Sequence, residues 1–366
     1  DRGVMNNERA KNYQFFSTTK DAVEAMYREI RQARRSVYWE TYILDDDAVG
    51  TRFIELLCAK AREGVEVKII LDGYGSFWVA EKMMQKLKDS GAEALYFNPL
   101  RFRGIFGGVR RWLERNHRKV LIVDETVGFI GGVNVDEESR DWFDLHVRVT
   151  GQIVSGLLKY FGRTYLASGG VVNRIKYFLY LPIVKQRYWR LMWHRPRENY
   201  SSIHNVYIKA IQSAKKSLTL VSPYFLPDSK IISALAEAKR KGVKINLILP
   251  KETDHRLLTY AGRTYWSVLY NLGIKVYLVK KMIHAKAMMV DDKWAMVGSS
   301  NFDAQTFYRS YETNLIFTSQ QMIKDLKVIF KGWRKQSRLF RPVKWARRSL
   351  FHRVYEFFGR LLRQYL

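Results

Sequence analysis

The chain of 366 residues has one cysteine, no long apolar run and a shortage of negative charge. The single cysteine, Cys58, excludes an internal disulfide and a metal site built from cysteines, and it fits a reducing cytosolic setting. No run of 18 or more apolar residues is present, and the first residues, DRGVMNNERA, lack the apolar core of a signal peptide. We therefore expect that any contact with a membrane is made from its surface.

Acidic residues are far outnumbered by basic ones. The 35 Asp and Glu residues stand against 63 Lys and Arg residues, which leaves a formal net charge of +28. A field of this sign favours a polyanionic partner, either nucleic acid or an anionic membrane surface, and charge alone does not choose between them. The length predicts two domains, and 47% hydrophobic residues are sufficient for buried cores.

One short pattern of polar residues, HxKxxxxD, occurs twice. It is formed by His117, Lys119 and Asp124 in the first half and by His284, Lys286 and Asp291 in the second. Around each copy the sequence predicts a strand, a tight polar turn and a second apolar strand, which is typical of a β-hairpin. Since residues two apart on a strand share a face, the histidine and lysine of each copy are expected to point the same way.

The similarity between the two copies extends beyond the motif itself. Each histidine is followed by a small-residue turn, GGVN or GSSN, and then by an acid at a similar distance. The matching residues are Asn134 with Asn301, both 17 positions beyond the histidine, and Asp144 with Glu312. Four polar residue types at matching offsets indicate an internal duplication rather than chance.

Helices and strands are predicted in the same order in both halves. In the first half we expect helices at 18–33, 51–63 and 82–90 and strands at 36–44, 65–73 and 92–98. In the second we expect helices at 206–214, 230–241 and 263–272 and strands at 217–226, 243–250 and 275–279. This alternation predicts an α/β fold with mixed, largely parallel sheets. The expected domains are a first half at 12–170, a basic aromatic linker at 171–200, a second half at 201–335 and an amphipathic tail at 336–366.

The ends of matched strands provide four pocket candidates, because open α/β sheets usually bind ligands at the carboxyl ends of their strands. These candidates are Glu40, Tyr42, Ser222 and Tyr224. A structural role in the core is an equally good expectation for each of them.

Three stretches interrupt the duplication, and each combines basic residues with large apolar ones. Residues 100–115 are expected to form a loop at the mouth of the site, and residues 173–197 to link the halves. Beyond position 349 apolar residues recur at helical spacing among arginines. This spacing predicts a helix that lies in a lipid headgroup layer or, alternatively, packs on the body of the protein.

The paired HxKxxxxD motifs, each followed by GGxN or GSxN, resemble those of the phospholipase D superfamily. The segments ETYIL, LDGYGS, FIGGVN and SPYFLPD, together with the basic tail, are similar to bacterial cardiolipin synthases of the phospholipase D type. The resemblance covers nearly the whole chain. It implies two pseudo-twofold related α/β/α halves whose motifs meet at one phosphodiester-processing site, with no metal or other cofactor.

The resemblance also implies a role for each site residue. His117 would be the nucleophile that forms a phosphohistidine, and His284 the acid and base. The groups expected to hold the phosphate oxygens are Lys119, Lys286, Asn134 and Asn301. Those expected to orient the imidazoles are Asp144 and Glu312. Asp124 and Asp291 are expected to hold the hairpin and its lysine rather than to take part in the chemistry.

The same resemblance implies transfer of a phosphatidyl group from one phosphatidylglycerol to the glycerol hydroxyl of another, which gives cardiolipin and glycerol. The alternatives are a phospholipase D that yields phosphatidic acid and a nuclease of the same superfamily. The expected partner is an anionic phospholipid membrane, with nucleic acid less favoured and the oligomeric state open. We expect a peripheral location on the cytoplasmic face of the bacterial cytoplasmic membrane.

Overall fold

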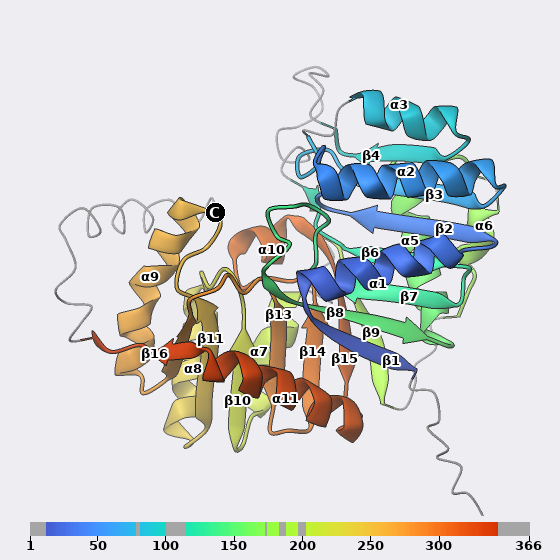
Figure 1. Ribbon diagram of the computed structural model, residues 1–366. Coiled ribbons are helices and arrows are strands. Elements are labelled where there is room, and N and C mark those ends of the chain that lie inside the picture. Colours follow the sequence, from blue (N-terminus) through green and yellow to red (C-terminus); the bar gives the residue numbers. More distant parts are fainter. Residues whose placement is uncertain are drawn as a thin grey trace, which may run out of the picture.

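The computed structural model describes residues 12–77, 81–99, 114–172, 174–182, 188–196 and 203–342. Within these residues the chain forms two α/β halves, each built around one sheet (Figure 1). The first half runs from blue to green in the figure and the second from yellow to red. The order of elements predicted for the duplication is present in both halves.

The described sheet of the first half has seven strands in the order β1-β8-β7-β6-β2-β3-β4. They are β1 (Tyr13–Thr18), β2 (Ser36–Thr41), β3 (Glu66–Asp72), β4 (Glu93–Phe97), β6 (Val120–Val123), β7 (Val127–Gly131) and β8 (Phe143–Thr150). The helices are α1 (Thr19–Gln32), α2 (Ala48–Arg62), α3 (Glu81–Asp89), α5 (Ile153–Ala167) and α6 (Ile175–Phe178). At the start of α1 the Thr18 hydroxyl accepts a hydrogen bond from the Asp21 N–H group, which caps the helix.

The described sheet of the second half has nine strands. Two of them come from chain segments that precede residue 203. They are β5 (Arg115–Asn116), β9 (Trp189–His194), β10 (Ser217–Val221), β11 (Lys244–Pro250), β12 (Lys275–Val279), β13 (Lys286–Val290), β14 (Trp294–Gly298), β15 (Ser310–Phe317) and β16 (Ser337–Leu339). The helices are α7 (Ile203–Ser213), α8 (Ser229–Arg240), α9 (Arg256–Asn271), α10 (Ala304–Tyr308) and α11 (Gln320–Lys335). None of the described helices has the length and apolar character needed to cross a membrane.

Both sheets are mixed, but the prediction that they are largely parallel is wrong. Among the described strands, β2-β3-β4, β10-β11-β12 and the short β15-β5 pair are parallel. All the other pairings are antiparallel. The cause is the motif hairpin, which adds two antiparallel strands to each sheet and is followed by a third, β8 or β15.

The segments predicted as a linker and a tail contribute strands to the second sheet. β9, from the expected linker, pairs antiparallel with β15 along its whole length, and β16, from the start of the expected tail, pairs with β12. The predicted mouth loop at 100–113 and the predicted tail helix beyond 349 lie outside the described residues. Of the described part of residues 171–200, β9 therefore belongs to the second sheet, whereas α6 packs beside α5 of the first half.

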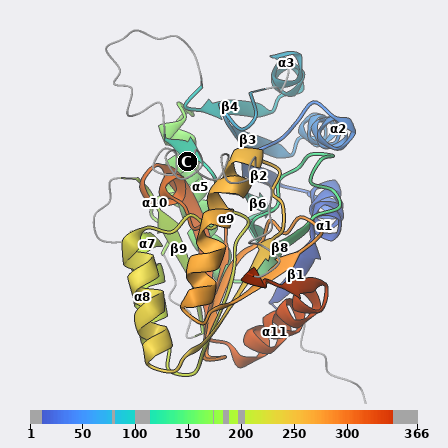
Figure 2. The same cartoon turned by 90° about the vertical axis from the view of Figure 1, so that its left-hand side faces the viewer.

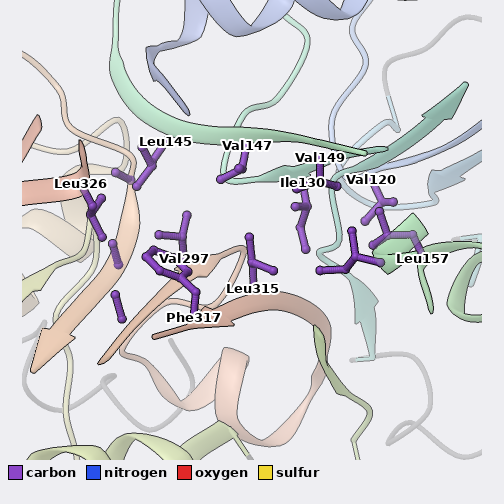
Figure 3. Packing of buried hydrophobic residues seen from close by; sticks show 14 of the residues in the cluster. Val120, Ile130, Leu145, Val147, Val149, Leu157, Val297, Leu315, Phe317 and Leu326 are labelled. Atoms are coloured by element: carbon purple, nitrogen blue, oxygen red, sulfur yellow. The ribbon is translucent and has the colours of Figure 1, made fainter. Parts of the chain in front are cut away.

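The two sheets share one central hydrophobic core. Side chains of β7 and β8, such as Ile130 and Val147, pack in the same buried cluster as Val297, Leu315 and Phe317 of β14 and β15 (Figure 3). Helices α5 and α11 cover this cluster, whereas α7 and α8 cover the opposite face of the second sheet, as Figure 2 shows. This shared core fixes the two halves against each other and so positions their motifs.

Candidate active site

The turn of the first motif hairpin holds an aspartate whose carboxylate binds backbone amides. Asp124 and Glu125 have left-handed conformations, with φ of 51° and 61°, a region that Asp tolerates better than most residues. The Asp124 carboxylate accepts hydrogen bonds of 2.7–3.1 Å from the N–H groups of Arg34, Arg35 and Ser36. These bonds fasten the turn to the start of β2.

Asp291 has the same arrangement in the second copy, where it accepts bonds of 2.7–2.8 Å from the N–H groups of residues 215–217. Both aspartates lie at the far end of the hairpin from the histidine and do not line the cavity described below. The prediction that they hold the motif lysine does not match the contacts. The ammonium group of Lys119 instead donates to the backbone oxygen of His117 at 2.9 Å, and the second copy repeats this contact.

One cavity of about 590 Å³ brings the two motifs together. His117 and Asn134 reach it from the first half, and His284 and Asn301 reach it from the second. The motif lysines are buried beside it, each with 2% of its surface exposed. A single ligand in this cavity can therefore contact groups from both halves.

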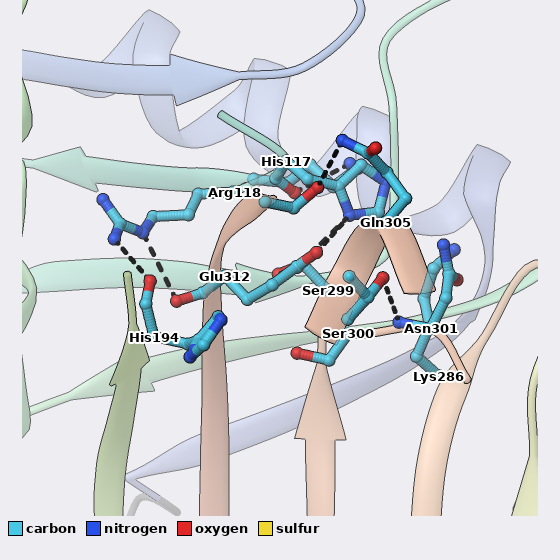
Figure 4. A network of polar contacts seen from close by, with 12 residues as sticks. His117, Arg118, His194, Lys286, Ser299, Ser300, Asn301, Gln305 and Glu312 are labelled. Atoms are coloured by element: carbon cyan, nitrogen blue, oxygen red, sulfur yellow. Dashed lines mark hydrogen bonds and ion pairs between the residues drawn. The ribbon is translucent and has the colours of Figure 1, made fainter. Parts of the chain in front are cut away.

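His117 is held by a strand of the other half. Its backbone N–H group donates to the carbonyl oxygen of Tyr311 in β15 at 3.1 Å. Its ring Nδ1 lies 3.0 Å from Oε1 of Glu312, the next residue of that strand (Figure 4). The carboxylate therefore fixes the ring so that Nε2 is left for the cavity.

His284 has the equivalent contacts with a strand of the first half. Its N–H group donates to the carbonyl oxygen of Phe143 in β8 at 2.7 Å, and its Nδ1 lies 2.8 Å from Oδ2 of Asp144. Each imidazole thus takes its acid from the opposite half. The sequence identified both acids but did not indicate that the pairs cross.

The two acids differ in their surroundings. Burial raises the pKa of Asp144, but the charge and hydrogen bond of His284 outweigh it and hold that pKa below its ordinary value. Burial raises the pKa of Glu312 well above its ordinary value, although the Ser299 hydroxyl donates a hydrogen bond to the carboxylate. At the position matching Ser299 stands Gly132, where a Cβ atom would lie 2.3 Å from the Asp144 carboxylate. Asp144 is therefore the better counter-ion for a protonated imidazole.

Positive charge gathers around the cavity. Burial lowers the pKa of His117 well below its ordinary value, and the charges of Lys119 and Lys286 lower it further. Burial and Lys286 also lower the pKa of His284, against the opposing effect of Asp144. Burial lowers the pKa of Lys286 to about 8. An anionic ligand such as a phosphodiester would relieve this repulsion.

Two asparagines of the cavity wall have polar atoms that the described residues leave unpaired. The side-chain oxygens of Asn134 and Asn301 are buried without a hydrogen-bond partner in the part of the chain that the structure describes. Such atoms normally find a partner, so a ligand hydroxyl or water is expected there. Across the same described ranges, no group of three or more His, Cys, Asp or Glu side chains is arranged to hold a metal ion.

Of the four pocket candidates, only the tyrosines line the cavity. The ring centres of Tyr42 and Tyr224 lie 5.0 and 6.3 Å from the motif histidine of their own half. Glu40 is buried outside the cavity, 4.0 Å from the guanidinium of Arg118, and the Ser222 hydroxyl donates to the backbone oxygen of Tyr224. The prediction for Glu40 and Ser222 is wrong because β2 and β10 end before the tyrosines, so the alternation of faces does not continue to them.

Other residues of the cavity wall were not predicted. They are Ile43, Tyr74, Arg115, Asp254, His255, Leu258, Asp303, Gln305, Thr306 and Ser310. Asp254 accepts a hydrogen bond of 2.7 Å from the Tyr224 hydroxyl and so belongs to the His284 side of the cavity. Asp254 and His255 lie in the loop between β11 and α9, where no motif marks them.

A buried arginine next to His117 supports the site from behind. The guanidinium of Arg118 donates to the Thr164 hydroxyl at 2.7 Å and to the backbone oxygens of His194 and Glu312 at 3.0 and 3.3 Å (Figure 4). It therefore ties α5, β9 and β15 to the segment between β5 and β6 that carries His117. No sequence signal distinguished Arg118 from the other 62 basic residues.

The chain is similar to proteins of a known family. A family model described as "Cardiolipin synthase, PLD-like domain" matches residues 26–163 and 207–333. The chain is 31% identical to the probable cardiolipin synthase YwiE of Bacillus subtilis (strain 168), over 98% of this chain and 73% of that protein. It is also 31% identical to cardiolipin synthase 2 of Bacillus anthracis, over 93% of this chain and 68% of that protein.

The fold is also found in a solved structure of low sequence similarity. The phosphatidylserine synthase of Haemophilus influenzae Rd KW20 superimposes with a TM-score of 0.75 at 15% identity, over 98% of this chain and 96% of that one. This likeness concerns the fold alone. The family model matches both halves of the chain. The chain therefore belongs to the cardiolipin synthase family of phospholipase D-like enzymes.

Proposed function

We propose that the protein transfers a phosphatidyl group from one phosphatidylglycerol to the glycerol hydroxyl of another, giving cardiolipin and glycerol. The observation that carries this proposal is the pair of histidines at one cavity, each bound to a carboxylate of the opposite half. Exchange at phosphorus needs a nucleophile, a proton donor and fixed positive charge, and this cavity offers all three. The names of the relatives at about 30% identity support the same reaction.

In the first step Nε2 of His117 attacks the phosphorus of the donor lipid. The bond from phosphorus to the headgroup glycerol oxygen breaks, and His284 gives its proton to that oxygen, so that glycerol leaves. As the nitrogen–phosphorus bond forms, Glu312, whose pKa burial raises, takes the Nδ1 proton of His117. The product is a phosphatidyl-histidine.

In the second step neutral His284 removes a proton from the glycerol hydroxyl of a second phosphatidylglycerol. That oxygen attacks phosphorus, and the bond to His117 breaks with return of the proton from Glu312. Lys119 and Lys286 hold the non-bridging oxygens in both steps, and Asn134 and Asn301 bind oxygens of the ligand. Asp144 keeps its charge and stabilises the protonated form of His284, which supports His284 as the acid and base.

We propose that the mouth of this cavity faces the headgroup layer of the membrane. Tyr74 of the cavity wall is 60% exposed, and its neighbour Phe77 is 52% exposed. From the second half, Leu257 is exposed beside Leu258 of the wall. Aromatic and aliphatic side chains at such an opening suit the interface of a lipid membrane, and we propose that the protein meets the membrane on its cytoplasmic face.

The proposal is tested with vesicles of phosphatidylglycerol and product analysis by mass spectrometry. The parent should form cardiolipin, and both His117→Ala and His284→Ala should form none, because the first step needs the nucleophile and the proton donor. His204→Gln, a histidine outside the cavity that is paired with Asp228 at 2.8 Å, is the matched control and should remain active. Phosphatidic acid as the only product would assign the protein to hydrolysis, and cleavage of DNA without action on lipid would reject the proposal.

A further inference from the structure

A second cavity of about 440 Å³ lies where α5, β9 and the beginning of β15 meet. Ser310 of β15 lines the catalytic cavity, whereas the next residue, Tyr311, lines this one. The two cavities are therefore neighbours across one strand. Nothing in the proposed reaction uses the second cavity, which is called the arginine cavity below.

The lining of the arginine cavity is cationic. Arg163 and Arg195 are exposed at it, and none of its described lining residues is acidic. The guanidinium carbon of Arg163 lies 5.1 Å from the ring centre of Trp193, and that of the buried Arg118 lies 4.7 Å from the same ring. Two guanidinium groups on one indole repel each other, and an anion in the cavity next to Arg163 would reduce that repulsion.

Trp193, in the wall of this cavity, has a donor that the described residues do not use. Its ring stacks on Tyr160 with centres 5.0 Å apart and planes at 8°, so its position is fixed. Its indole Nε1 is buried and has no acceptor among the residues that the structure describes. A buried N–H group without a partner is costly, and an oxygen of a bound ligand would satisfy it.

We propose that the arginine cavity binds a phosphate group, carried either by a phospholipid headgroup or by free phosphate. The planar guanidinium groups of Arg163 and Arg195 suit the geometry of phosphate oxygens, and the indole N–H group provides a further donor. The remaining lining includes the apolar side chains of Leu166 and Leu179, which suit the carbon atoms next to a lipid phosphate. This site is separate from the one where the reaction takes place.

The first arm of the test uses inorganic phosphate and isothermal titration calorimetry. Arg163→Gln combined with Arg195→Gln should lose one equivalent of bound phosphate that the parent binds, and Lys286→Met, which alters the catalytic cavity, should retain it. Trp193→Phe keeps the stacked ring but lacks the donor, and it should weaken this equivalent about 5- to 10-fold. Arg62→Gln with Arg240→Gln removes the same charge from exposed positions elsewhere and should bind like the parent.

The second arm uses sedimentation with vesicles of phosphatidylglycerol, with phosphatidylcholine vesicles as the neutral reference. If the double variant loses affinity for the anionic vesicles relative to the charge-matched control, the ligand is a lipid headgroup. If only the phosphate equivalent is lost, the ligand is free phosphate. If the double variant and the charge-matched control bind alike in both arms, the proposal is wrong. Neither arm depends on catalysis, so the result is independent of the proposed function.

Discussion

Replacing Asp124 by Asn should lower the stability of the protein while leaving its turnover close to that of the parent. Asp124 belongs to the repeated HxKxxxxD motif, yet its carboxylate binds the backbone N–H groups of residues 34–36 and lies outside the cavity. Asn tolerates the left-handed turn conformation as Asp does. The substitution therefore removes the charge without straining the backbone.

The magnitude follows from the bonds that weaken. A hydrogen bond to a charged acceptor contributes about 1 kcal/mol more than one to a neutral acceptor, and three such bonds give about 3 kcal/mol. The carboxylate is partly exposed, which reduces this value to about 1.5 kcal/mol because water screens the charge. For a chain of 366 residues this corresponds to a loss of about 2 °C in Tm.

Thermal unfolding and initial rates on phosphatidylglycerol vesicles measure the two effects separately. Asp291→Asn should behave in the same way, because it has the same three contacts in the second half. Asp89→Asn, at an exposed position near the end of α3, serves as the control and should change neither quantity. A fall of 100-fold in kcat with an unchanged Tm would refute the structural role argued here.

Three further outcomes are expected. Asp144→Asn should lower kcat about 100-fold or more. It should also move the alkaline limb of the kcat–pH profile to lower pH, because Asp144 raises the pKa of His284. Glu312→Gln should lower kcat less and leave that limb in place, and equal profiles for the two variants would contradict this reasoning. Lys286→Met should abolish activity yet raise stability at pH 7 by about 3 kcal/mol in urea unfolding, because burial lowers the pKa of Lys286 to about 8. The free-energy cost of burying the charged form of Lys286 has its full value below pH 8 and decreases as the pH rises toward 10.5. The stability gained by Lys286→Met should therefore decrease over this pH range. Arg118→Met should cost about 3–5 kcal/mol by leaving Glu40 buried without its cation, and Glu40→Gln in the same chain should recover part of this loss.

The sequence predicted the elements of each half because their signals are local. Hydrophobic periodicity marked helices such as α1 and α8 within a few residues of their observed ends. The repeated spacing around His117 and His284 also identified the acid that binds the ring of each motif histidine. These features depend on residues close together in the chain or repeated at fixed offsets.

Features that depend on packing between distant segments were not predictable. Nothing in the offsets of Asp144 and Glu312 indicates that each acid binds the histidine of the other half, since the two acids follow the histidines of their own halves at similar distances of 27 and 28 residues. The β9 segment mixes arginine with tryptophan and has no regular alternation of apolar and polar residues. It forms a strand because it pairs with β15. Asp254 reaches the cavity because the loop after β11 turns toward Tyr224, a contact 30 residues apart.

The exchange of acids between the halves has a consequence for how this chain can change. A separated copy of either half would contain an imidazole and a carboxylate that never meet, and so would lack a working dyad. The functional unit is the interface between the two copies rather than either copy alone. A substitution in β8 therefore affects His284, which lies just before β13. Sequence change in one repeat is therefore limited by the other repeat, which explains why the two remain recognisable as duplicates.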